Sequence, residues 1–230
     1  MENNEIVQRP IARIRTDFAS KFGIPRQSGL VPALTARIFF EPEFRSDEAV
    51  RGIEGYSHLW LLWQFSANAR PDAPFSPTVR PPRLGGNVRV GVFASRSPFR
   101  PNGIGLSCVA LERVDYDDPA GPVLIVRGAD LMDGTPILDV KPYVPYADSH
   151  PEARGGFTDA VRARTVRVEC PPALLETLPE DRREALLGVL EQDPRPSYQD
   201  DPARVYGFGF AGREVRFRVA DGVLTVVEIR

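Results

Sequence analysis

The chain is organised around one stretch, Arg83-Leu-Gly-Gly-Asn-Val-Arg-Val-Gly-Val-Phe-Ala-Ser-Arg-Ser-Pro-Phe-Arg-Pro-Asn-Gly-Ile-Gly-Leu106. Its alternating, β-branched run at 88–94 predicts a strand. The strand is expected to end in a rigid loop, because Pro98 and Pro101 fix the backbone angle φ and remove two amide donors. Loops held in this way at strand ends are places where scaffolds present functional side chains.

This stretch and its flanks carry a concentrated positive charge. No Asp or Glu occurs between Ala73 and Leu111, although the formal net charge of the whole chain is −2. A guanidinium on a rigid loop binds phosphate or carboxylate through two parallel hydrogen bonds. The charge predicts an anion site, with an ordinary solvated basic loop as the alternative. The basic residues in this interval are Arg80, Arg83, Arg89, Arg96 and Arg100.

Short strand patterns surround this stretch. The most hydrophobic of them, 56–65, contains both tryptophans and predicts a strand buried on both faces. About seven short strands joined by turns predict a mainly β fold, a small barrel or sandwich, and argue against an α/β dinucleotide-binding domain. Besides 88–94 and 56–65, we expect strands at 6–14, 34–40, 106–116, 123–127 and 137–143.

The pattern changes after Tyr146. A polar segment from Asp148 to Thr158 is a plausible linker. Beyond it, 179–190 has a proline start, acids in its first turn and leucines at one-face spacing, which predicts a helix. Strand patterns flank this helix, and Asp221-Gly222 predicts a hairpin. We therefore divide the chain into a β-barrel domain, 1–147, and a small α+β domain, 148–230, which is near the lower size limit for an independent core.

The composition narrows the class of protein. With 42% hydrophobic and 26% charged residues in 230, the chain is expected to be soluble and globular. It shows no membrane span and no signal-peptide pattern, so the cytoplasm is the expected location. Cys108, Cys170, His58 and His150 offer neither metal-ligand spacing nor a disulfide framework. We expect no metal and no Ser/His triad.

Several segments together resemble the TrmO (TsaA-like) family. The resemblance implies a small β-barrel that acts as a homodimer and transfers a methyl group from S-adenosyl-L-methionine to tRNA. It implies that the acceptor is the exocyclic nitrogen, N6, of threonylcarbamoyladenosine at position 37, next to the anticodon. The matching segments are 22–27, 57–60, 80–87, 91–105, 130–143 and, in the C-terminal part, Gln192-Asp-Pro-Arg-Pro196.

The resemblance also implies site residues. Two positions differ from the family pattern: Gly103 stands where a proline is common, and Ser66-Ala67 where a His-Gln pair is common, so contacts at Ser66 would use its backbone. The cofactor set carried over is Pro25, Arg26, Gln27, Ser66, Arg96, Leu106, Leu131, Asp133, Gly134 and Thr135.

Chemistry at the acceptor nitrogen suggests further candidates. A carbamoylated adenine nitrogen is a weak nucleophile, so a base would help, and Asp133 or Asp139 could accept its proton while Lys141 or Arg96 steadies the charge. For Asp133 the alternative is a turn residue, and for Lys141 a solvated charge. Tyr143 and Tyr146 could stack on a base or simply pack.

For tRNA we assign binding to Arg80, Arg83, Arg100, Tyr143 and Tyr146, with the barrel supplying most of the affinity and the C-terminal domain orienting the RNA. A non-catalytic RNA- or nucleotide-binding barrel would use the same arginines and aromatics. A metal-dependent nucleotide hydrolase is a third class, which would require a divalent ion.

Overall fold

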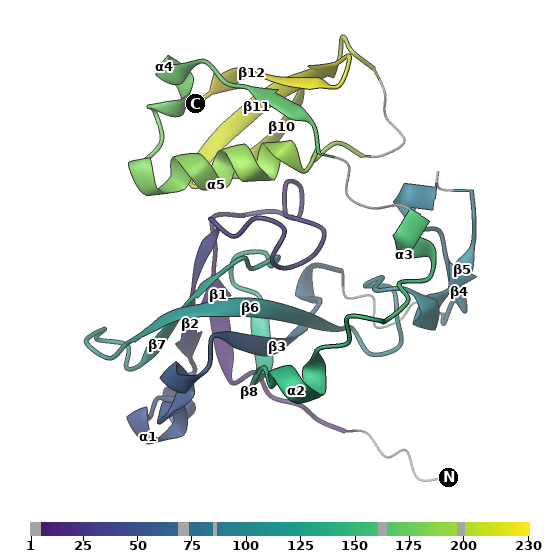
Figure 1. Ribbon diagram of the computed structural model, residues 1–230. Helices are drawn as coiled ribbons and strands as arrows, with labels where there is room; N and C mark the ends of the chain where they lie inside the picture. The colour runs from purple at the N-terminus through teal and green to yellow at the C-terminus, as the bar shows by residue number, and fades with distance from the viewer. Residues whose placement is uncertain (1–5, 69–73, 85–86, 161–164, 197–200) are drawn as a thin grey trace.

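The computed structural model describes residues 6–68, 74–84, 87–160, 165–196 and 201–230. Figure 1 shows a β-barrel in its lower half and a separate layer, one long helix against a sheet, in its upper half. The mainly β prediction with a C-terminal α+β part is confirmed. None of the helices in the described ranges has the length and apolar character of a membrane span.

The barrel is a closed sheet of six strands in the order β1-β2-β7-β6-β3-β8, with every neighbouring pair antiparallel. It closes where β1 pairs with β8, through Ala12 opposite Ile137. Closure leaves the barrel without an exposed edge. The strands are β1 (Ala12–Arg15), β2 (Thr35–Phe40), β3 (His58–Gln64), β6 (Ile104–Asp115), β7 (Val123–Arg127) and β8 (Pro136–Pro142).

Two strand predictions in the barrel need correction. The predicted strand at 6–14 begins only at Ala12. Strand β3 is not buried on both faces: Leu59 and Leu61 point into the core, while the alternate side chains are half-buried or, like His58, exposed. Its outward aromatic, Trp60, packs against Tyr143 with ring centroids 5.8 Å apart, so an aromatic cluster rather than a second layer explains the hydrophobic pattern.

The run at 88–94 is not a barrel strand, and the prediction was wrong there. Only β5 (Val90–Gly91) is extended, and it pairs with β4 (Thr78–Val79) in a separate two-stranded sheet. The N–H of Val92 donates to the carbonyl of Pro77, and the chain then turns into a 3-10 helix, Val92–Ala94. Prolines on both sides of β4 limit the partner strand to two residues, because proline cannot donate to a ladder.

The remaining short elements connect these strands. One helical turn, α1 (Asp47–Val50), follows β2, and Gly52 comes after it with φ 84°. The others are the 3-10 turns Pro42–Phe44, Ile53–Gly55, Ser66–Asn68 and Pro82–Leu84, and the single-turn helices α2 (Pro145–Asp148) and α3 (Phe157–Ala160).

The C-terminal layer packs helix α5 (Glu180–Glu191), with the short α4 (Pro172–Leu175), against a four-stranded sheet. Strand order is β10-β11-β12-β9, and β9 runs parallel to β12. Asp221 and Gly222 both have positive φ, 51° and 76°, as the predicted hairpin turn requires. The strands are β9 (Arg167–Glu169), β10 (Tyr206–Phe210), β11 (Arg213–Ala220) and β12 (Val223–Ile229).

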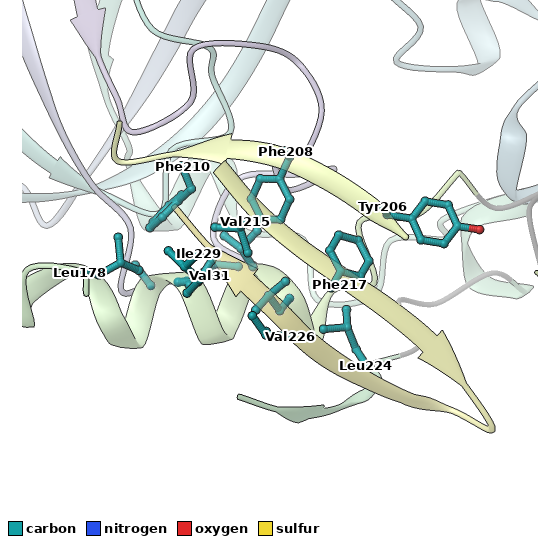
Figure 2. Packing of buried hydrophobic residues seen from close by; sticks show 14 of the residues in the cluster. Val31, Leu178, Tyr206, Phe208, Phe210, Val215, Phe217, Leu224, Val226 and Ile229 are labelled. Carbon is teal, nitrogen blue, oxygen red and sulfur yellow. The ribbon is translucent and has the colours of Figure 1, made fainter. Parts of the chain in front are cut away.

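The loop between β1 and β2, residues 16–34, belongs to the C-terminal core rather than to the barrel core. Phe18, Val31 and Leu34 are buried in the same cluster as the side chains of α5 and β10–β12. Figure 2 shows Val31 among Leu178, Val215 and Ile229. The ring of Phe18 meets that of Phe210 edge-on, with centroids 5.5 Å apart. We call residues 16–34 the bridging loop.

Candidate functional site

The predicted Pro25-Arg26-Gln27 segment lies in the bridging loop, where the C-terminal layer supports it. Gly23 has φ 92°, and a Cβ at this position would lie 2.3 Å from the ring of Phe208. Only glycine allows this backbone to turn so closely under β10. The Nη2 of Arg26 donates to the carbonyl of Arg195 at 3.3 Å, which ties the segment to the chain after α5.

Gln27 connects this segment to the loop that contains Arg96 and Arg100, residues 95–103, which we call the basic loop. Nη1 of Arg96 donates to Oε1 of Gln27, and Nε2 of Gln27 donates to the carbonyl of Arg26 at 2.5 Å. The basic loop is itself rigid, since Nη1 of Arg100 donates to the carbonyl of Ser95 at 3.0 Å. Residues that are 69 positions apart in sequence, Gln27 and Arg96, thus share one side-chain hydrogen bond.

These two loops enclose a cavity of about 600 Å³ at the mouth of the barrel. Five of the predicted cofactor residues line it: Pro25, Arg26, Gln27, Arg96 and Leu106. The other walls combine aromatic side chains, contributed by Trp63, Phe65 and Phe93, with the carboxylate of Asp130. This volume is within the roughly 300–1,000 Å³ typical of small-molecule sites, and apolar walls with a few polar groups are their usual lining.

A wider cleft of about 2130 Å³ continues from this cavity between the barrel and the C-terminal layer. Among the described residues that line it, seven carry a positive charge and one, Asp193, a negative charge. Such an excess of cations in a cleft attracts a polyanion. The predicted tRNA contacts Arg80 and Arg100 lie here, together with Lys21, Arg26, Arg89, Arg96 and Arg195.

The predicted residues 131–135 lie elsewhere, outside the described walls of both cavities. Leu131 is buried in the barrel core. Asp133 accepts a hydrogen bond from the backbone N–H of Thr16 at 3.0 Å and from Arg15 at 3.1 Å, and the hydroxyl of Thr135 donates to the carbonyl of Met132. With Gly134 at φ 75°, these contacts match the turn alternative for Asp133. Their cofactor role stays a prediction.

Other predicted residues also lie away from the two cavities. Asp139 and Lys141 form an ion pair of 2.8 Å on β8. Tyr143 packs edge-on against His58, with centroids 6.1 Å apart, and Tyr146 is 93% exposed. Ser66 is exposed in the 3-10 turn after β3. The side chain of Arg83 lies outside the described residues. The catalytic and RNA-binding roles of these residues, and the cofactor-binding role of Ser66, stay predictions.

Asp130 is a cavity residue that was not among the predicted site residues, although it begins the matched segment 130–143. Its carboxylate reaches the smaller cavity and accepts a hydrogen bond of 2.5 Å from the hydroxyl of Ser107. Burial raises the pKa of this carboxyl above its ordinary value, while the hydrogen bonds from Ser107 and from backbone N–H groups and the charge of Arg96 act in the opposite direction. A carboxyl perturbed in this way inside a cavity is a candidate functional group. Within the described ranges, no cluster of His, Cys, Asp and Glu could hold a metal ion.

Comparison with known proteins agrees with the geometry. The family model of the tRNA-methyltransferase O N-terminal domain matches residues 13–149, and that of the TrmO C-terminal domain matches residues 163–230. A tRNA (adenine(37)-N6)-methyltransferase of Escherichia coli is 40% identical over 220 residues, 92% of each chain. A human tRNA (adenine(37)-N6)-methyltransferase is 36% identical over 155 residues, 65% of this chain and 32% of the human protein.

A crystal structure of TrmO from Pseudomonas aeruginosa has a TM-score of 0.80 to this structure at 35% identity, covering 100% of this chain and 98% of the other. The first family model covers the barrel and the second covers the C-terminal layer, and the likeness to the crystal structure covers both. The resemblance deduced from the motifs is therefore confirmed, and the chain belongs to the TrmO family of tRNA methyltransferases.

Proposed function

We propose that this protein transfers a methyl group from S-adenosylmethionine to N6 of the adenosine at position 37 of tRNA. The observation that carries the proposal is the convergence of Pro25–Gln27, Arg96 and Leu106 on one cavity at the barrel mouth, in a chain of this family. Relatives named as tRNA (adenine(37)-N6)-methyltransferases, from bacteria and mammals, support the reaction. Names that link relatives to S-adenosylmethionine support the cofactor.

The residues of the smaller cavity fit this cofactor. Trp63, Phe65 and Leu106 offer apolar and aromatic surface for the adenine ring and the aliphatic part of the methionine chain. Arg96 offers a guanidinium for the cofactor's carboxylate. When bound, the cofactor supplies a sulfonium-activated methyl group. The protein's task is then to hold the acceptor nitrogen in line with that carbon at about 3–3.5 Å and to exclude water.

The wider cleft is the place we assign to the RNA. Its seven cationic side chains come from both parts of the molecule, since Arg80 and Arg100 belong to the barrel domain and Arg195 follows α5. We therefore expect both parts to contribute to the affinity for tRNA. The sequence had predicted only an orienting role for the C-terminal part. Each phosphate neutralised should give a slope of about −0.7 to −0.9 in log affinity against log salt.

Three finer statements belong to the same proposal. Family resemblance supports threonylcarbamoyladenosine as the acceptor and a homodimer as the active form. Relatives that modify tRNA support the cytoplasm as the location. The homodimer has further support from the walls of the smaller cavity and of the wider cleft, where Phe93, Phe99 and Leu106 are 72%, 50% and 49% exposed. Exposed apolar side chains grouped beside a site are typical of an interface. Sedimentation at micromolar concentration measures this directly, and a monomer would contradict the assignment.

The test is methyl transfer to purified tRNA, followed by mass spectrometry of its nucleosides. We expect one methyl group on the position-37 nucleoside, and a strong loss of transfer in Arg96→Ala. Arg51→Ala is the matched control, because Arg51 follows α1 on the outer surface and pairs with Glu48. Cofactor binding without methyl transfer would favour a non-catalytic RNA-binding barrel, and transfer lost in chelator would favour a metal-dependent enzyme.

A further inference from the structure

Asp130 lies where the bridging loop, the end of β7 and strand β6 meet. It follows β7 by three residues and lines the smaller cavity together with Gln27 and Arg96. None of the candidate roles considered so far uses this carboxylate. Burial disfavours the charged form of this carboxyl group, and the neighbouring residues show what holds it in place.

On the barrel side, Asp130 ends a chain of side-chain hydrogen bonds. The indole Nε1 of Trp63 donates to the hydroxyl of Ser107 at 3.0 Å, and that hydroxyl donates to Oδ1 of Asp130 at 2.5 Å. Ser107 is 1% exposed and Trp63 is 9% exposed. The indole can only donate, so the single hydroxyl proton of Ser107 is directed at the carboxylate. The barrel thereby fixes the orientation of Asp130.

On the loop side, the backbone N–H of Ser28, the residue directly after Gln27, lies near enough to the carboxyl group of Asp130 to lower its pKa. Ser28 is held a second time, because its hydroxyl accepts from the backbone N–H of Cys108 on β6 at 3.1 Å. The next residue, Gly29, donates its N–H to the carbonyl of Gly128 at 2.8 Å. Ser28 and Gly29, which directly follow the Pro25–Gln27 segment, therefore attach it to the barrel beside Asp130.

The charge of Asp130 also acts on the opposite wall. Arg96 is close enough for its charge to act on the carboxyl group, and Arg96 donates to Gln27. The carboxylate thus favours the position in which the Arg96 guanidinium faces the cavity and the Gln27 side chain. Without the negative charge of Asp130, the side chains of Arg96 and Gln27 could adopt other conformations while the barrel core stays unchanged.

We propose that Asp130 is a positioning residue of the cofactor site, whose carboxylate holds the Pro25–Gln27 segment through Ser28 and orients Arg96 from the barrel wall. The inference rests on the proposed function, because the segment matters only if it binds the cofactor. It differs from the roles assigned to Asp133 and Asp139, since Asp130 acts through neighbouring residues. An asparagine of the same shape would keep part of the hydrogen bonding but lose the charge.

The test compares Asp130→Asn with the wild type by calorimetric titration of S-adenosylhomocysteine, the stable product form of the cofactor. Loss of a charged hydrogen-bond partner should weaken binding by about tenfold or more. KM for S-adenosylmethionine should rise more than kcat falls. Amide exchange at Ser28 should be faster than in the wild type. Asp115→Asn is the matched control, because Asp115 lies at the far end of β6 and pairs with Arg37 and Arg113.

Thermal stability separates this role from a purely structural one. Burial raises the pKa of the Asp130 carboxyl, so ionisation of this group lowers the stability of the folded state. The loss of stability is absent at a pH below the unfolded-state pKa and complete at a pH above the folded-state pKa. The melting temperature of Asp130→Asn should therefore equal or exceed that of the wild type at neutral pH, and the difference should shrink in acid. The other charged side chains among the described residues of this cavity are Arg26, Arg96 and Arg100.

Each outcome decides between the ideas. A wild-type protein that binds neither form of the cofactor would defeat the proposed function itself. A wild type that binds, with Asp130→Asn binding equally well, would overturn the role of Asp130 alone. A parallel fall in melting temperature and affinity would show that the carboxyl serves stability instead. Ser28→Ala, which removes only the second attachment to Cys108, should weaken binding less than Asp130→Asn does, and the opposite order would also contradict the proposal.

Discussion

The two hydrophobic cores of this protein are built differently. The barrel core is made by its own strands, and closure of the sheet supplies partners for both edges of each strand. The C-terminal core is incomplete without the bridging loop: Phe18, Val31 and Leu34 fill it beside α5 and the sheet. Val31 is seen there in Figure 2. A layer of one long helix and four strands is near the size limit for an independent core, so borrowed side chains stabilise it.

This difference has a consequence for the site. The same loop that completes the second core carries Pro25–Gln27 to the mouth of the barrel. Packing in the C-terminal layer should therefore affect cofactor affinity, while packing at the far side of the barrel should affect mainly stability. Four experiments test this contrast, in order of the effect expected.

The largest effect is expected from Phe210→Ala. Phe210 is fully buried and meets Phe18 edge-on, so its truncation should cost about 3–5 kcal/mol in the free energy of unfolding. It should also weaken cofactor binding, because Phe18 anchors the bridging loop. Ile38→Ala, a fully buried position in the barrel, is the comparison. Denaturant unfolding and calorimetric titration measure both quantities, and equal losses of affinity in the two variants would remove the contrast.

Gly23→Ala should have the next largest effect. The new Cβ would lie 2.3 Å from the ring of Phe208 at φ 92°, and such overpacking costs about 1–3 kcal/mol. The displaced loop should bind the cofactor more weakly. Gly29→Ala is a close control, since Gly29 has φ 78° in the same loop but no neighbour within 4 Å of the new Cβ. Thermal unfolding and titration of both variants separate steric displacement from backbone strain.

Asp17→Asn should have a smaller effect that depends on pH. Asp17 in the bridging loop pairs with Arg182 of α5 at 3.0 Å, yet burial raises the pKa of its carboxyl. A raised folded-state pKa means that the stability which this group contributes is present in acid and is lost as pH rises through that pKa. Asparagine is uncharged, like the protonated carboxyl, so the variant should match the wild type in acid and equal or exceed its stability at neutral pH. Melting curves from pH 3 to pH 8 provide the measurement, and a difference independent of pH would contradict the assignment.

The smallest effects are expected at surface ion pairs in either part. Arg13→Ala in the barrel and Arg216→Ala in the C-terminal sheet each remove a partly exposed pair, with Glu41 and Glu228 respectively. Both should change the free energy of unfolding by no more than about 1 kcal/mol. Neither should change cofactor affinity. A larger loss in Arg216→Ala than in Arg13→Ala would show that the surface, and not only the core, distinguishes the two parts.

Local patterns in the sequence predicted much of the secondary structure. Short apolar strand patterns predicted β2 and β7 nearly to their bounds, and the proline start with its leucine spacing predicted α5. The predictions failed where a strand can form only if another segment of the chain pairs with it. The run at 88–94 has strand-like residues, but proline-bounded β4 offers it only two residues of ladder. The domain boundary at 147/148 stays a prediction.

The sequence by itself determined which residues could form the site: the acid-free basic stretch and the motif resemblance pointed to Arg26, Gln27 and Arg96 as ligands of the cofactor. Only the tertiary structure decided which candidates meet. It brought Gln27 to Arg96 across 69 positions, turned Asp133 toward Arg15, and placed Asp130 in the cavity instead. The physical reason is that barrel closure and the packing of Phe18 and Val31 under the C-terminal layer fix the bridging loop, and these are long-range contacts that no local pattern encodes.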